Sequence, residues 1–418
     1  MTIYRISINF IQSTTFSSCC IQFCPIILMS VSKKQYSRNT LKPGEKVNNY
    51  IVVKLIGQGG YGDIYMVTDE NDQQSKSTSS KKSGEKHKNS HKHKNKSKDA
   101  EPRNENNENV KTYAMKVELA SCQITSLGIE QKILESLQNS IYFPKIYGHG
   151  FQTHFRYLVM DLYGQSLSNT RRKMLERHFS VSTTLRLGIF MMKCIEEFHK
   201  RGFVHCDIKP GNFLLHNNSP CPIVLIDYGL SKNFIDQNSG QPIKEKKNCG
   251  FVGTSKYASL QIHQGLDPCR RDDIISLCYS LAEMSEGKLP WRFTEDTDIH
   301  VVMKSKKTTP AQTVFSLFPS QIASIYNYAM NLKYDDVPNY NGIYKLFSDA
   351  LEELNISEKD PFDWEKLSDQ NSEENDQMSF KNYPKAEDTE LFPPDFDRNM
   401  DLPDEFEEEE EGGCCLIC

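Results

Sequence analysis

Four polar side chains suited to phosphoryl transfer lie close together near the middle of the sequence. Asp207, Lys209 and Asn212 fall within six residues around a Pro-Gly turn, and Asp227 follows fifteen residues after Asn212. One carboxylate can orient a hydroxyl, while an amide and a second carboxylate can hold a divalent metal ion. The motif is short, so its meaning depends on a phosphate-binding loop and a paired lysine upstream.

A glycine cluster lies upstream, at Gly57, Gly59, Gly60 and Gly62. Glycines let backbone N–H groups approach phosphate oxygens without a side chain in the way. The G-x-G-x-x-G spacing is shared with dinucleotide-binding folds, in which a helix follows the glycines. Here β-forming residues flank the cluster over 50–68, which favours two strands joined by a tight turn. A purely structural hairpin is the alternative to a nucleotide-binding loop.

A lysine and a glutamate that can form an ion pair follow the glycines. Lys116 lies in an alternating strand over 112–118, and Glu130 lies in a helix with apolar residues at fourfold spacing. The apolar residues that mark this helix are Ile129, Ile133 and Leu137. An ordinary surface pair is the alternative, but the order of glycine loop, lysine and glutamate favours a site for nucleotide phosphates.

Apolar spacing further along the chain predicts one more strand and then a run of helices. The strand covers 155–163, and a helix begins near Thr170. A clearer helix runs from Ser182, its N-cap, to Arg201. Its apolar stripe is Leu185, Ile189, Met192 and Ile195, and later helices are expected at 273–284, 322–332 and 340–354. A small strand-rich part followed by a larger helical part indicates a two-lobed α+β fold.

Composition fits a globular enzyme with some disordered sequence. The chain has 418 residues, of which 38% are hydrophobic and 25% charged, and its net charge is -5. This charge is too small to imply nucleic acid or a membrane surface as a partner. The 13 cysteines show neither paired metal spacing nor a dense disulfide framework, which favours a reducing compartment. No apolar run is long enough for a transmembrane helix.

Three segments lack the pattern of packed structure. Residues 1–44 form an N-terminal tail whose interrupted apolar stretch argues against a cleaved signal peptide, and Met29 is an alternative start. Residues 70–110 are rich in lysine and histidine, so we expect a disordered basic insert. Residues 357–418 turn polar and acidic, and we expect a disordered tail. This tail either stays in solvent, occupies the basic site as an autoinhibitor, or meets the lysine-rich insert.

In order and content, these motifs resemble those of eukaryotic protein kinases over residues 45–356. The matching segments are 57–62, 114–116, Glu130, 205–212 and 227–229. Within the kinases, the chain resembles the casein kinase 1 family, because 253–259 reads Gly-Thr-Ser-Lys-Tyr-Ala-Ser and 270–273 reads Arg-Arg-Asp-Asp. Segments 182–188, 289–292 and 362–366 look most like the tau-tubulin kinase branch, while Tyr228 and 287–291 are similar to vaccinia-related kinases.

The resemblance implies a role for each motif residue. Asp207 and Lys209 would be catalytic, and Asn212 and Asp227 would bind Mg²⁺. ATP would contact Gly57, Gly59, Gly60, Gly62, Lys116, Glu130, Met160 and Leu162, with 161–163 as the hinge beside the adenine. Thr254 would bond back to the catalytic loop, and Asp273 would brace the backbone of that loop. ATP and Mg²⁺ are therefore the expected cofactors, and proteins the expected substrates.

Three positions bear on regulation and substrate choice. Cys206 stands where many kinases have an arginine that pairs with a phosphorylated activation loop, so we expect activity without that phosphorylation. Tyr228 replaces phenylalanine and keeps the aromatic packing, so Asp227 should still bind metal. Lys256 occupies the basic site that fits a phosphate on the substrate in this family. A lysine that merely faces solvent is the alternative.

The last four residues, Cys415 to Cys418, have the form of a prenylation motif and follow Cys414. A cysteine in last place is not a usual choice for prenylation, and one lipid chain binds membranes only marginally. We expect a cytoplasmic protein. The nucleus, or a membrane reached through lipid on Cys414 and Cys415, are further locations to consider, and an unmodified tail is the alternative.

The sequence thus predicts a serine/threonine protein kinase that favours acidic or phosphate-primed protein substrates. Its kinase domain would cover 45–356, with the N-lobe at about 45–162 and the C-lobe at about 163–356. A non-catalytic scaffold with a kinase fold, which recruits partners through the basic insert and acidic tail, is the rival hypothesis. The presence of Lys116, Asp207 and Asp227 argues against it. A small-molecule phosphotransferase is disfavoured by the segment at 253–259.

Overall fold

Most of the chain between residues 41 and 370 can be described. The computed structural model covers 41–59, 62–71, 111–120, 126–217, 219–236, 238–291 and 298–370. The glycine-loop tip, nearly all of the basic insert and everything after residue 370 lie outside these ranges. The expectations about Gly60, Cys414 and Cys415 therefore lie outside the described residues.

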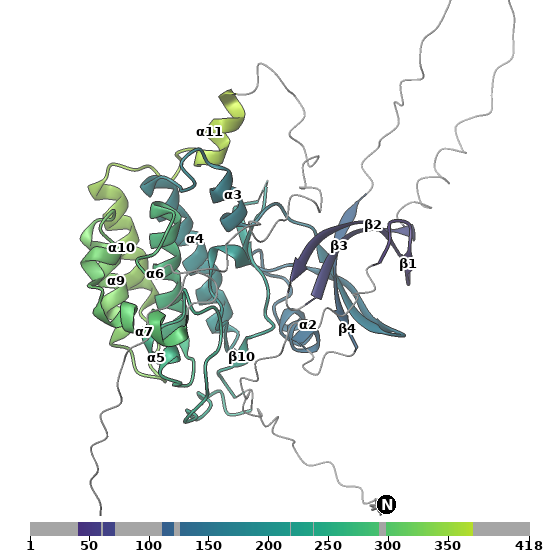
Figure 1. Cartoon of the computed structure of the whole chain (residues 1–418), viewed down its shortest axis with the longest axis horizontal. Helices are drawn as coiled ribbons and strands as arrows, with labels where there is room; N and C mark the ends of the chain where they lie inside the picture. The colour runs from purple at the N-terminus through teal and green to yellow at the C-terminus, as the bar shows by residue number, and fades with distance from the viewer. Residues whose placement is uncertain are drawn as a thin grey trace, which may run out of the picture. The chain divides into compact units, whose positions relative to one another are not determined.

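The first part of the chain forms an antiparallel sheet of six strands in the order β1-β2-β3-β4-β6-β5 (Figure 1). The strands are β1 (Lys46–Val47), β2 (Tyr50–Gly59), β3 (Gly62–Asp69), β4 (Thr112–Leu119), β5 (Ile146–Gln152) and β6 (Phe155–Asp161). Alternate side chains pack into one core that includes Tyr65, Val67 and Met115. The predicted hairpin and the strand that carries Lys116 are both confirmed.

Helix α2 (Ser126–Ser136) belongs to this part of the molecule and has one buried face. That face carries Leu127, Glu130, Ile133 and Leu134. The helix predicted from the spacing of Ile129, Ile133 and Leu137 is confirmed, but Ile129 itself is 36% exposed. Two residues correspond to about 200° around a helix, which turns Ile129 away from the face set by Leu127.

The rest of the chain is mainly helical. Its helices are α3 (Leu167–Lys173), α4 (Val181–Lys200), α5 (Leu260–His263), α6 (Arg270–Glu286), α7 (Ile299–Thr308), α8 (Ala311–Val314), α9 (Ser320–Met330), α10 (Tyr340–Glu353) and α11 (Asp363–Gln370). Two small sheets pair β7 (Phe203–Val204) with β10 (Lys232–Asn233), and β8 (Phe213–Leu215) with β9 (Ile223–Leu225); the 3₁₀ turn η1 (Pro210–Asn212) precedes β8. The predicted α+β fold, a strand-rich part followed by a larger helical part, is confirmed. Among the described residues, no helix has the length and apolarity to cross a membrane.

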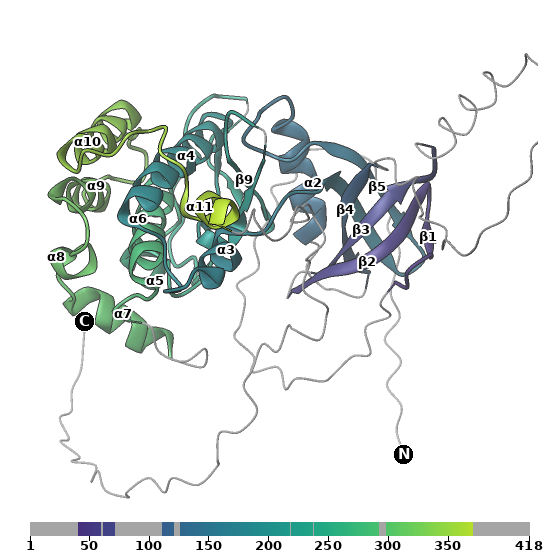
Figure 2. The same ribbon diagram turned by 90° about the horizontal axis from the view of Figure 1, so that it is seen from above.

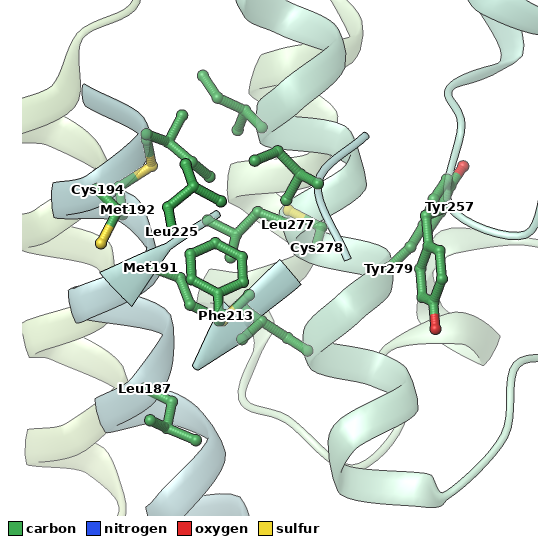
Figure 3. Close-up of a cluster of buried hydrophobic side chains, with 14 of the residues drawn as sticks. Leu187, Met191, Met192, Cys194, Phe213, Leu225, Tyr257, Leu277, Cys278 and Tyr279 are labelled. Atoms are coloured by element: carbon green, nitrogen blue, oxygen red, sulfur yellow. The ribbon is translucent and has the colours of Figure 1, made fainter. Parts of the chain in front are cut away.

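The helical part is built around α4 and α6, which pack against each other. Figure 3 shows Phe213 of β8 and Leu225 of β9 between Met192 of α4 and Leu277 of α6, and all four are buried. Helix α6 is buried on nearly every side, which explains why its apolar residues do not form one narrow stripe. This packing fixes the two short strands that lie between Asn212 and Asp227.

Three predicted element ends shift for tertiary reasons. Helix α3 starts three residues before Thr170, with Ser166 as its N-cap. Helix α4 takes Ser180 rather than Ser182 as its N-cap, because Ser180 also bonds to Asp363, far along the chain. Strand β6 ends at Asp161 rather than at residue 163. The chain leaves the sheet there, since the Gly164 N–H donates to the Leu215 carbonyl.

The polar tail begins later than expected. Residues 357–370 were predicted to be disordered, but they are ordered and end in α11, beside α4 and α3 (Figure 2). Trp364 packs edge-on against Phe179, and the buried Arg186 of α4 contacts the same segment. Its guanidinium donates to the Asp360 and Pro361 carbonyls and stacks 4.4 Å from the Phe362 ring centroid. At the other end, Leu41 is buried in the core of the sheet, so the ordered chain begins before residue 45.

We expect Arg186→Gln to lower the free energy of unfolding by about 1–3 kcal/mol, because the Asp360 and Pro361 carbonyls lose the charged donor that holds them on α4. Urea unfolding followed by circular dichroism measures the change. The matched control is Arg156→Gln on an exposed position of β6, which should change stability by less than about 0.5 kcal/mol. Equal unfolding midpoints for the two variants would contradict this assignment.

Candidate active site

The sheet aligns the glycine loop with Lys116. Gly57 of β2 pairs with Ile64 of β3, which in turn pairs with Lys116 of β4. Gly62 has a φ of +130°, and a Cβ placed on it would lie 2.2 Å from the Val117 carbonyl oxygen. Only glycine fits at that position. The second strand of the hairpin can therefore start close to the lysine strand.

Lys116 forms two ion pairs that join the sheet, α2 and the second acidic motif. Its Nζ lies 2.6 Å from Glu130 Oε2 and 3.0 Å from Asp227 Oδ1. Burial alone would lower the pKa of Lys116, but Glu130 and Asp227 together outweigh burial and raise it. Burial would raise the pKa of Asp227, yet Lys116 holds it below its usual value. Both groups are therefore charged at neutral pH, as a site for anionic phosphate and a metal requires.

Glu118 positions the helix that carries Glu130, a role that the sequence analysis missed. It is only 3% exposed, and its Oε1 accepts from the Ser126 N–H at 3.0 Å and from the Ser126 hydroxyl at 2.7 Å. A carboxylate at a helix N-terminus stabilises the unpaired N–H groups there. The strand that carries Lys116 thus also holds the first turn of the helix that supplies its partner. The acid lies outside the helix, so capping spacing within the sequence gives no indication of it.

Asp207 lies at the centre of the catalytic loop and is held by three polar groups. Its Oδ2 accepts from Lys209 Nζ at 2.6 Å, and its Oδ1 accepts from the Thr254 hydroxyl at 2.7 Å. Thr254 also accepts from Lys209 at 3.0 Å, which closes a three-membered network. Asn212 Nδ2 donates to the Asp207 carbonyl at 2.9 Å. Four of the residues singled out in the sequence are therefore brought together.

Asp273 braces the backbone of that loop. Its carboxylate accepts from the N–H groups of His205 at 2.8 Å and Cys206 at 2.9 Å, and from His199 Nε2 at 2.9 Å. Cys206 has a φ of +68°, a left-handed conformation that needs support in a residue other than glycine. Gly253 packs against the same turn, because a Cβ on it would lie 2.3 Å from the Cys206 carbonyl oxygen. The loop shape is thus fixed from two sides.

A family model described as protein kinase domain matches residues 50–325. The chain is also 34% identical over 318 residues to a Dictyostelium discoideum protein named as a probable serine/threonine-protein kinase. That match covers 76% of this chain, and the chain spans about half, 56%, of the relative's length. This chain belongs to the protein kinase family. The motif residues described above therefore lie in a kinase domain.

The oxygen atoms left at Asn212 and Asp227 suit Mg²⁺, which protein kinases use together with ATP. Asn212 donates through Nδ2, which leaves Oδ1 as an acceptor, and Asp227 meets Lys116 through Oδ1. The Ile226 N–H donates to the Asn212 carbonyl at 2.9 Å, so the two candidate ligands belong to adjoining backbone. Within the described ranges no group of three or more His, Cys, Asp or Glu side chains could hold a metal. An ion here would take its remaining ligands from water and phosphate, as Mg²⁺ commonly does.

Asp161 fixes the segment 161–163, which is expected to form the hinge beside the adenine. Its carboxylate accepts from the Lys145 N–H at 3.0 Å, from the Tyr147 hydroxyl at 2.8 Å and from the Tyr163 hydroxyl at 3.2 Å. Met160 precedes it and packs against the helical core. The side chain of Asp161 is thus occupied in holding the hinge. The expected contacts to adenine at Met160 and Leu162 remain a prediction.

Tyr228 and Cys206, the two departures from the common kinase pattern, are both buried. The Tyr228 hydroxyl donates to the Leu225 carbonyl, and its ring stacks on Phe198 with centroids 5.5 Å apart. The added hydroxyl is therefore satisfied inside the core. Cys206 lies in a small apolar cluster with Phe234 and Tyr334.

Lys256 already has an anionic partner inside the domain. It pairs with Glu283 of α6, and its side chain is 29% exposed. Glu283 also accepts from the Tyr257 hydroxyl and from Arg171 at 3.3 Å. Lys256 is therefore held in a fixed position instead of extending freely into solvent. The expected contact between Lys256 and a substrate phosphate remains a prediction.

Lys306 supports the same segment from inside, and the sequence analysis missed it. This lysine of α7 is 3% exposed and donates to the carbonyls of Ser255 at 2.7 Å and Ala258 at 2.6 Å. Burial lowers its pKa. His263 Nε2 lies 3.1 Å from the Ser255 carbonyl and 3.3 Å from Lys306. One lysine in a run of basic residues gives no indication that it will be buried.

The stability of this segment should depend on pH through His263. Burial, with help from Lys306, lowers the pKa of His263 from 6.5 to about 4. Between these values the unfolded chain binds a proton that the folded chain does not, so stability falls as the pH drops from 6.5 towards 4. We expect thermal scans to show a smaller loss of Tm over this range for His263→Gln, whose amide can still donate to Ser255. The exposed His154→Gln serves as control, and a wild-type curve that coincides with the His263→Gln curve would refute the role.

Proposed function

We propose that this chain is an active serine/threonine protein kinase of the casein kinase 1 type, which transfers the γ-phosphate of ATP to protein hydroxyls. The observation that carries the proposal is the complete set of polar contacts around Asp207. The carboxylate is held by Lys209 and Thr254, and the amide of Asn212 is locked onto the same loop. The named relative supports serine/threonine specificity, although activity of the whole protein is part of the proposal.

In this proposal each residue has a separate task. Bound ATP and Mg²⁺ would supply the phosphoryl group and neutralise its charge. Lys116, fixed by Glu130, would hold phosphate oxygens. Asp207 would accept a hydrogen bond from the substrate hydroxyl and orient it for in-line attack. Lys209 lies 2.6 Å from Asp207, where its charge can stabilise the transferred group.

The casein kinase 1 assignment, and within it the tau-tubulin kinase branch, is supported by two features of the described chain. In the segment Gly253–Ser259, the Thr254 hydroxyl donates to Asp207. Lys256 of this segment pairs with Glu283, and its Ser255 carbonyl accepts from Lys306. The branch-like segment 362–366 contributes to α11, and its Phe362 ring packs against Arg186 of α4. We propose a kinase domain over 45–356 to which 357–370 are added as a packed extension.

Asp207→Asn should lower kcat at least 100-fold, because the amide cannot accept and orient the hydroxyl proton as the carboxylate does. Circular dichroism should show a normal fold, and the KM for ATP should change less than threefold. Transfer of radiolabelled phosphate from Mg-ATP to an acidic protein substrate measures the effect. Asp349→Asn, on the outer face of α10, is the matched control and should retain full activity. Equal incorporation by wild type and Asp207→Asn would favour the non-catalytic scaffold.

Lys256→Gln should reduce kcat/KM for phosphate-primed peptides about tenfold more than for unprimed ones. The partly exposed cation of Lys256, within the segment 253–259, can pair with a phosphate on the substrate, which carries close to two negative charges. Lys256→Arg should retain most of the preference, because it keeps both the charge and the pair with Glu283. The exposed Lys304→Gln serves as control for net charge. Equal losses on both peptides would exclude the phosphate contact.

A further inference from the structure

The segment from Asp227 to Ser259, here called the activation segment, is anchored by a carboxylate that lies outside it. Asp267 lies between α5 and α6 and is only 4% exposed. Its Oδ1 pairs with Lys232 of β10, and its Oδ2 accepts from the Lys246 N–H at 3.0 Å. Two separate points of the activation segment are therefore fixed to one buried anion.

A third partner ties the same anion to the helical part. The Tyr334 hydroxyl donates to Asp267 Oδ2 at 3.1 Å, and Lys232 Nζ lies 5.5 Å from the centroid of the Tyr334 ring. The cation is thus held between a carboxylate and an aromatic face. Burial of the Lys232–Asp267 pair is tolerable because the carboxylate also accepts hydrogen bonds from the Lys246 N–H and the Tyr334 hydroxyl.

The anchored point lies directly beside the catalytic loop. Lys232 is paired across the small sheet with Val204 of β7, the residue before His205. The Ser231 hydroxyl donates to the His205 carbonyl at 3.2 Å, and the N–H groups of Phe234 and Ile235 donate to the Gly202 carbonyl. A shift of Lys232 would therefore move the backbone that presents Asp207.

Many kinases hold this region with an added phosphate that pairs with an arginine before the catalytic aspartate. Here Cys206 takes the arginine position and is buried with Val204, Phe234, Cys269 and Tyr334. The pKa of its thiol is raised by burial, and Lys232 and Asp267 are among the charges that act on it. The pair of Lys232 and Asp267 thus lies close to the position of the missing arginine.

We propose that Asp267 is a built-in anion that anchors the activation segment to the catalytic loop, and that this anchor takes the place of an added phosphate. The proposal rests on the proposed kinase function. It assigns Asp267 and Lys232 as positioning residues that act through the backbone at 203–207 and touch neither ATP nor the substrate. The segment is then in its working conformation as soon as the chain folds.

The test compares phosphatase-treated wild type with Asp267→Asn and Asp267→Glu in the full chain. Asp267→Asn should lower kcat at least tenfold while the KM for ATP changes less than threefold. Amide hydrogen exchange, measured without nucleotide, should be at least tenfold faster between Lys232 and Cys249. Asp267→Glu keeps the charge and should recover most of both properties. Asp363→Asn, which removes a carboxylate contact at Ser180, controls for general loss of stability and should leave exchange at 232–249 unchanged.

The outcomes separate this proposal from the proposed function. If wild type transfers no phosphate but Asp267→Asn still speeds exchange only in this segment, the anchor stands and the kinase assignment fails. If phosphatase-treated wild type is active and Asp267→Asn matches it in kcat or in exchange, the anchor is refuted. Loss of wild-type activity on phosphatase treatment would also overturn it, because the segment would then depend on an added phosphate.

Discussion

The catalytic loop depends on one buried carboxylate, that of Asp273. It accepts hydrogen bonds from the two successive backbone N–H groups of His205 and Cys206, and a third from His199 Nε2. Cys206 can keep a positive φ because these bonds offset a conformational cost of about 1–3 kcal/mol. Asp207 is the next residue, so the direction of its side chain follows from this turn. Asp273 belongs to α6, the most deeply buried of the described helices, so this helix fixes the turn.

From that turn, polar contacts extend in two directions. Gly253 packs against the turn and Thr254 bonds to Asp207, which connects the loop to the segment 253–259. Glu283 and Lys306 hold the same segment through Lys256 and Ser255. His205 connects it to the second acidic motif, because its Nε2 donates to the Ile226 carbonyl at 3.2 Å. Burial lowers the pKa of His205, which keeps the ring neutral with Nδ1 free to accept from the Asp207 N–H. A neutral imidazole thus links the backbone at Asp207 to the backbone just before Asp227 without adding a charge.

The sequence predicts the central motifs well because each is local. The glycine spacing, the lysine strand and the Asp207 loop are read from a few neighbouring residues, and the structure joins Lys116 with Glu130 and Asp227. Glu118, Asp267 and Lys306 are not predictable in this way. Each is a charged residue whose burial depends on partners elsewhere in the chain. For the same reason the sequence predicts Ser182 as the N-cap of α4, whereas the N-cap is Ser180, whose second partner, Asp363, comes after a long gap.

Charge balance explains why a cysteine suits position 206. Lys232 and Asp267 form a compact pair, with side-chain exposures of 17% and 5%. An arginine at 206 would bring a second cation towards one carboxylate, and an uncompensated buried charge costs about 3–5 kcal/mol. An added phosphate would supply the missing anion, which is the arrangement of kinases that keep the arginine. The small side chain of cysteine is uncharged, so it needs neither a second carboxylate nor an added phosphate as a partner. The cysteine and the proposed Asp267 anchor are therefore two parts of one electrostatic solution.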